Sequence, residues 1–133
     1  MSPSRALQQA VFAALSVDAA LTALIGPGRI YDDVPQGSRP PYVTFGSATA
    51  HDWSTGSEPG TEHLFTLHVW SDTRGKLEAQ EVLAAIRAAL HEQALAVFGH
   101  TLVNLRHDRS ETRRTPDGEL IQGTARFRAV TEP

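Results

Sequence analysis

The sequence contains no cysteine. This absence excludes disulfide bonds, thiolate zinc sites, iron–sulfur clusters and cysteine nucleophiles together. There is also no run of about 18 apolar residues, which is the length that a transmembrane helix requires. The first residues, Met1–Arg5, lack the apolar segment and the small-residue cleavage site of a signal peptide. We therefore expect a soluble protein that is made in the cytoplasm and does not associate with a membrane.

An excess of positive charge is missing as well. The formal net charge is −3 at pH 7, whereas dedicated nucleic-acid-binding proteins are usually basic because phosphate contacts dominate their affinity. Hydrophobic residues make up 41% of the chain and charged residues 20%, as in ordinary globular proteins. The length of 133 residues fits one domain, which we predict to span residues 1–133.

Recognised catalytic motifs are absent too. The sequence has no G-x-S-x-G nucleophile elbow, P-loop, G-x-G-x-x-G fingerprint or H-E-x-x-H zinc motif. Its six histidines show no recognised ligand spacing, and His63 and His68 point to opposite faces because they are five residues apart on one predicted strand. We therefore predict no metal, no cofactor and no catalytic residue. A small ligand- or metal-binding domain that uses the histidines remains the alternative from another functional class.

Two polar segments contain residue types that serve in catalysis elsewhere. Asp32-Asp33 is a carboxylate pair in a loop rich in proline and glycine, where a turn-forming role is favoured over acid–base work. His51, Asp52 and Ser54 or Ser57 have the composition of a catalytic triad, but all lie in one predicted loop without a rigid scaffold. We therefore predict that the protein is not an enzyme.

The hydrophobic periodicity predicts seven elements in the order α-α-β-β-α-β-β. Ser2 and Pro3 are typical of a helix start, and Gly26 of a helix end. In the loop 29–41, only Ile30-Tyr31 is able to form a short extended segment. The predicted helices cover residues 3–15, 18–25 and 74–91, and the predicted strands cover residues 42–50, 61–71, 101–115 and 119–130.

This order predicts an α+β fold, with an antiparallel sheet of about four strands and helices packed on one face. The strand pattern assigns apolar side chains to the helix-covered face, and the first strand of the final hairpin is expected to place Val103 and Leu105 together there. The buried side chains expected on the other two strands are Phe65, Leu67, Val69, Ile121, Ala125, Phe127 and Ala129. The segment Arg106–Glu119 is charged, and we expect it to extend beyond the core.

The opposite face of the predicted sheet is polar and aromatic, and we expect it to meet another subunit. Trp53 and Trp70 are candidate anchors, because tryptophan is enriched at interaction hot spots. The arginines of the final hairpin alternate with acidic residues, which favours a salt-bridged ribbon over a surface that tracks phosphates. The candidate interface residues are Trp53, Trp70, Arg106, Arg109, Arg113, Arg114, Arg126 and Arg128.

Several segments in order resemble the tail-completion, or tail-terminator, family of long-tailed bacteriophages and gene transfer agents. The most specific part is the Ile-Tyr-Asp-x-Val-Pro segment followed by Pro-Tyr-Val-Thr-Phe, and the resemblance covers nearly the whole chain. The matching segments are Ala6–Ala10, Asp18–Leu24, Arg29–Pro35, Pro40–Gly46, Leu67–Ser71 with the helix after it, and Phe127–Ala129.

The resemblance implies a structural virion protein. Members of this family form a ring of six copies at the head-proximal end of the tail, which ends polymerisation of the tail tube and joins it to the head connector. The implied partners are therefore other copies of the chain, the tail tube protein and the stopper protein of the connector, while DNA passes through the lumen without specific binding. Such a protein is made in the cytoplasm of the bacterial host and ends in the virion. A stopper or adaptor component of the connector is the alternative within this class.

Overall fold

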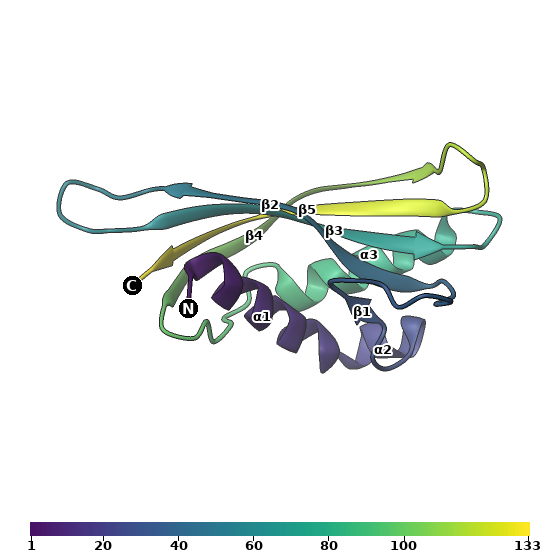
Figure 1. The fold of residues 1–133 in the computed structure, drawn as a ribbon, viewed down its shortest axis with the longest axis horizontal. Coiled ribbons are helices and arrows are strands. Elements are labelled where there is room, and N and C mark those ends of the chain that lie inside the picture. Colours follow the sequence, from purple (N-terminus) through teal and green to yellow (C-terminus); the bar gives the residue numbers. More distant parts are fainter.

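The computed structural model describes residues 1–133 and contains one five-stranded sheet with three helices on one of its faces (Figure 1). This arrangement confirms the predicted α+β class and the packing of helices on a single face. The elements are α1 (Pro3–Ser16), α2 (Ala19–Ile25), β1 (Ile30–Tyr31), β2 (Tyr42–Asp52), β3 (Thr61–Ser71), α3 (Leu77–Leu90), β4 (Thr101–Arg114) and β5 (Ile121–Glu132).

The sheet has one strand more than predicted and is mixed rather than purely antiparallel. Its order is β1-β2-β3-β5-β4, and the short β1 pairs in parallel with β2. The guanidinium of Arg29 explains this pairing, because it donates hydrogen bonds to the carbonyl oxygens of Arg39 and Pro41 and so folds the loop back along its own start. Ile30 is thereby buried beside Val43.

Side-chain caps define the first two helices. The Ser2 hydroxyl accepts a hydrogen bond from the Arg5 amide at 3.2 Å, and the Asp18 carboxylate accepts one from the Leu21 amide at 3.0 Å. The third helix begins at Leu77, three residues later than predicted. No single helix is long and apolar enough to cross a membrane; α1 and α2 reach that length and composition only as a pair, and they are bent by 76°.

The core lies between the helices and the covered face of the sheet and contains 23 buried hydrophobic residues. Its centre is a stacked pair of rings, Phe65 and Phe127, whose centroids are 5.4 Å apart. All seven side chains predicted to be buried on β3 and β5 belong to this core, which confirms the expected alternation. Val103 was predicted to join Leu105 there but is exposed, because a β-bulge between Leu102 and Asn104 interrupts the alternation.

No residue of the segment Arg106–Glu119 is buried, as expected of a segment that extends beyond the core. Figure 1 shows the end of the β4–β5 hairpin beside the connection between β3 and α3, where the Arg114 guanidinium donates to the Arg74 carbonyl oxygen at 2.8 Å. The β2–β3 hairpin extends past the start of α1, at the opposite end of the molecule (Figure 1). This hairpin is longer than predicted because β2 continues to Asp52.

Candidate interaction surface

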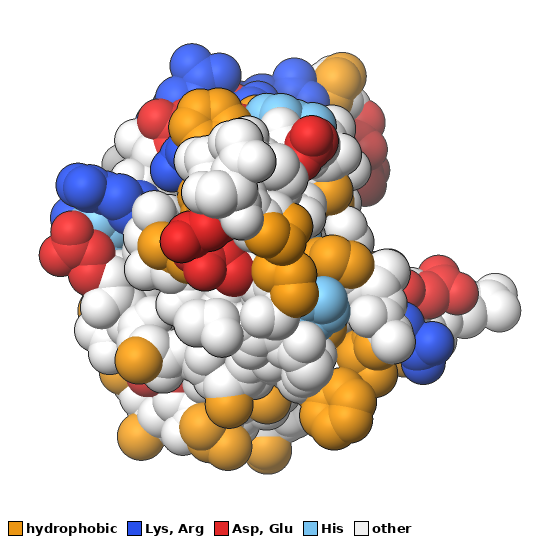
Figure 2. Space-filling model, turned by 90° about the vertical axis from the view of Figure 1, so that its left-hand side faces the viewer, with side chains coloured by type: hydrophobic (Ala, Val, Ile, Leu, Met, Phe, Trp, Pro, Cys, Tyr) orange, Lys and Arg blue, Asp and Glu red, His pale blue; other side chains and the backbone are white.

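The face of the sheet that no helix covers is called the open face here. Figure 2, seen from the end where the β2–β3 hairpin projects, shows Lys and Arg side chains gathered along the top, on the side away from the helices. By strand register, the open face carries Glu62, Leu64, Thr66, His68, Trp70, Arg106, Arg109, Glu111, Arg113, Gln122, Thr124, Arg126 and Arg128.

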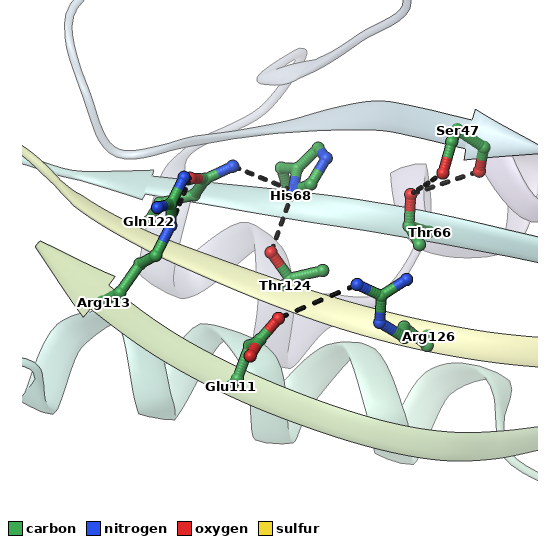
Figure 3. A network of polar contacts seen from close by, with 8 residues as sticks. All are labelled: Ser47, Thr66, His68, Glu111, Arg113, Gln122, Thr124 and Arg126. Carbon is green, nitrogen blue, oxygen red and sulfur yellow. Dashed lines mark hydrogen bonds and ion pairs between the residues drawn. The ribbon is translucent and has the colours of Figure 1, made fainter. Parts of the chain in front are cut away.

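Polar side chains on the open face bond mainly to one another (Figure 3). The His68 ring lies at the centre, where its Nδ1 is 3.1 Å from the Thr124 hydroxyl and 3.2 Å from the Gln122 amide nitrogen. Arg113 donates to the Gln122 amide oxygen at 3.1 Å, which extends the network from β3 across β5 to β4. The three strands are thus joined into a surface whose side chains are already held in place.

The surroundings of the His68 ring favour its neutral form. Partial burial lowers the pKa of His68, and the positive charges of Arg126 and Arg113 lower this pKa further. The backbone of β2 also passes close to the ring, because position 46 is a glycine: a Cβ atom there would lie 2.5 Å from His68 Nε2. Gly46 therefore lets β2 and β3 approach each other beside the network.

A second cluster joins the base of the β2–β3 hairpin to β5. The Glu62 carboxylate lies 2.6 Å from His51 Nε2 and accepts a hydrogen bond from Arg128 Nε at 2.5 Å. The Trp53 ring lies against the same guanidinium, with 5.2 Å between the ring centroid and Arg128 Cζ. We call His51, Trp53, Glu62 and Arg128 the hairpin anchor.

The eight residues proposed as an interface lie in different parts of the structure. Trp53 and Arg128 meet in the hairpin anchor, while Arg113 and Arg126 belong to the network of the open face. Trp70 lies beside the network at the end of β3, with 6.0 Å between its ring centroid and that of His68, and its Nε1 donates to the Thr44 hydroxyl at 3.0 Å.

Arg114 lies on the other side of β4 from the open face, since it pairs with the buried Ile121. Sequence reasoning missed Glu62 and Gln122 as partners of the arginines. The available signal was the alternation of side chains along a strand. Glu62 is two residues before Leu64 and Gln122 is four residues before Arg126, so each points to the open face with that residue.

The arginines of the open face are placed unfavourably against one another. Arg106 pairs with Arg128 across β4 and β5, and Arg109 pairs with Arg126, although like charges directly opposite each other are destabilising. Three of the four have an acidic neighbour: Arg128 has Glu62, Arg126 has Glu111 at 3.8 Å and Arg106 has Glu92 at 3.7 Å. Arg109 has no ion-pair partner, so positive charge remains in excess on this face.

The segments that resembled catalytic groups serve structural purposes. Asp32 accepts a hydrogen bond from the Gln8 amide at 3.1 Å and so ties its loop to α1. The three triad residue types do not assemble, because His51 pairs with Glu62 while Asp52 accepts hydrogen bonds from the amide and hydroxyl of Ser54. No group of three or more His, Asp or Glu side chains is placed to hold a metal ion.

A groove of about 500 Å³ separates α1 from β2 and β3. It is lined by the side chains of Arg5, Gln8, Asp32 and Phe45, and its floor includes the buried His63. Several of its polar side chains are used within the fold, since Gln8 bonds to Asp32 and the His63 ring lies 2.9 Å from the Thr131 hydroxyl.

The buried histidine predicts a loss of stability in acid. Burial lowers the pKa of His63, and the charge of His100 adds to this effect. The unfolded chain, with an ordinary histidine pKa near 6.5, then binds a proton more readily than the folded chain. His63 therefore does not lower the free energy of unfolding above pH 6.5. As the pH decreases below 6.5, the free energy of unfolding decreases by up to about 1.4 kcal/mol per pH unit because of this residue.

Urea unfolding at pH 7.5, 6.0 and 5.0 measures this dependence. The His63→Gln variant keeps a hydrogen-bonding side chain but cannot be protonated, so we expect a shallower pH dependence from it. An equal dependence in the wild type and in this variant would assign the acid sensitivity to other residues.

A profile of the family described as Tail completion protein gp17 matches residues 9–132. One chain of a structure described as the virion of a native gene transfer agent particle is 33% identical, with a TM-score of 0.92, and the match covers 99% of this chain and 98% of that chain. The gp17 protein of bacteriophage SPP1 is 25% identical, with a TM-score of 0.61, over 95% of this chain and 88% of that chain. The comparison with curated sequences finds no match.

Proposed function

Because this chain belongs to the family of tail completion protein gp17, we propose that it is a structural virion protein that ends the tail of a phage or gene transfer agent. In this proposal, six copies form a ring on the last layer of the tail tube at its head-proximal end. The ring stops further addition of tube protein and presents a new surface to the stopper protein of the head connector. DNA passes through its lumen without specific binding.

One observation carries this proposal: nearly the whole chain matches a chain of a gene transfer agent virion in sequence and in fold. The network of the open face agrees with a role in assembly, because its side chains are bonded to one another and form a surface rather than a pocket.

The distribution of surfaces supports a ring. A ring of identical subunits requires two different patches on each copy, so that one patch contacts the other patch of its neighbour. In this chain the β2–β3 hairpin projects at one end and the β4–β5 hairpin ends at the other (Figure 1). The two ends of the sheet thus provide unlike surfaces, as a head-to-tail contact needs.

Deletion of the gene in the strain that produces the particles tests this function. Without a terminator the tube has no signal to stop growing, so we expect overlong tubes and heads without tails in electron micrographs. Expression of the wild-type chain from a second locus should restore tube length and joining. Tubes of normal length on unjoined particles would indicate a stopper or adaptor instead, and normal infectious particles would contradict both roles.

A further inference from the structure

The β2–β3 hairpin and the open face of the β4–β5 hairpin carry charge of opposite sign. The outer part of the β2–β3 hairpin, residues 46–64, contains the acidic residues Asp52, Glu58 and Glu62 but no lysine or arginine. Residues 106–128 of the β4–β5 hairpin contain six arginines and four acidic residues. The chain as a whole is mildly acidic, so this separation of charge reflects the placement of the residues and not the composition.

Charges on both surfaces are accessible. Glu62 is used inside the hairpin anchor, but Glu58 is exposed at the tip and its carboxylate has no ion-pair partner. On the open face of the β4–β5 hairpin, Arg109 is exposed and has no ion-pair partner, and it faces Arg126 across the strands. An acidic segment placed against this face would relieve the repulsion between the arginines.

The acidic hairpin also carries apolar area that no part of its own chain covers. Trp53 is 52% exposed and Leu64 is 46% exposed. Exposed large apolar side chains beside complementary charges are typical of interaction surfaces. The hairpin anchor holds Trp53 in place at the base of the hairpin. Because the hairpin is already ordered there, it loses little conformational freedom when it binds a partner.

From these observations we infer that the acidic β2–β3 hairpin of one copy docks on the arginine-rich side of the β4–β5 hairpin of the next copy. A second copy is the occupant because both complementary surfaces lie on the same chain but on different hairpins, and such a contact repeats from copy to copy until a ring closes. This inference rests on the proposed ring and names the surfaces that join its subunits.

Two variants with opposite changes of charge test the inference. The first, Gly56→Lys with Ser57→Lys and Glu58→Lys, makes the hairpin tip more positive by four units. A Cβ atom at Gly56 meets no atom within 4 Å, and its φ lies outside the left-handed region. The second, Arg109→Glu with Arg113→Glu, makes the other surface more negative by four units. Each variant then carries net charge of one sign on both surfaces.

Copies of either variant alone should not bind one another to form a ring, while a mixture of the two variants should form one. In a strain that lacks the gene, either variant alone is expected to lower the yield of particles on the order of 100-fold, because like charges across an interface oppose binding. Expression of both variants together should restore the yield, because a ring of six can close with the two kinds alternating. Mass spectrometry of the purified particles should then find the two variants in equal amounts.

A matched control separates charge at the two surfaces from charge in general. Gln80→Lys with Glu81→Lys and Ala84→Lys also adds four positive units, on exposed positions of α3, and should support wild-type yields. All variants should melt within about 5 °C of the wild type, which shows that they are folded.

Three results would overturn the inference: full yield from either variant alone, no rescue by the mixture of two folded variants, or loss of yield in the α3 control. The proposed function is tested separately by deletion of the gene. If tube length is unchanged after deletion while the two charge variants still rescue each other, the terminator role is contradicted and the contact between copies is not.

Discussion

Replacing Phe127 with alanine should lower the free energy of unfolding by about 3–5 kcal/mol. Phe127 is 1% exposed, stacks on Phe65 and receives the edge of the His107 ring, with 5.4 Å between the centroids in both pairs. It lies on the central part of β5, with β3 on one side and β4 on the other, so the cavity left by the smaller side chain cannot collapse easily. Urea unfolding of the purified protein measures this loss.

The control for this prediction is Phe12→Ala on α1. This substitution removes the same ring, but Phe12 is 46% exposed. We therefore expect the free energy of unfolding to change by no more than about 0.5 kcal/mol, as for most surface substitutions. If the two alanine variants lost equal stability, the packed pair of rings would not be the centre of the core.

Replacing Glu62 with alanine should lower the free energy of unfolding by about 2–3 kcal/mol. Its side chain is 11% exposed and is shared by Arg128 and His51, so its removal leaves a partly buried guanidinium without an acceptor. The expected loss is below that of a fully buried ion pair because the Arg128 side chain is 32% exposed and partly solvated. Urea unfolding gives the free energy, and faster amide hydrogen exchange over residues 51–62 should show that the hairpin base has loosened.

The matched control for Glu62 is Glu111→Ala. Glu111 also faces an arginine of β5, but the two side chains are 58% and 40% exposed and 3.8 Å apart. We expect its loss to cost less than about 1 kcal/mol, as for exposed ion pairs. Equal effects of the two substitutions would mean that the hairpin anchor does not stabilise the fold.

The fold was predictable where one physical rule dominates a segment. The alternation along residues 61–71 predicted β3 and its buried face, because a half-buried strand repeats every two residues. The strand β1 was not predictable as part of the sheet, since its two residues carry no periodicity and its pairing depends on the Arg29 side chain binding a loop ten or more residues away. Val103 was misplaced because a single bulge shifts the alternation without any signal in the sequence.

The candidate surface was predictable in part for the same reason. Strand parity placed Arg126 and Arg128 away from the core, and the structure agrees. Their partners were missed because Glu62 lies 66 residues from Arg128 and meets it only through the pairing of β3 with β5. The contact between the Arg114 side chain and the Arg74 carbonyl oxygen was not predictable either, since the two residues are 40 positions apart in the sequence.

The most direct test of a ring at the end of the tail is a cryo-electron microscopy map of the assembled particle at the junction of tail and head. The account predicts six copies of this chain in one layer, seated on the last ring of the tail tube, with the β2–β3 hairpin of each copy against the β4–β5 hairpin of its neighbour. A layer with another number of copies, or density for this chain only at the far end of the tail, would contradict it.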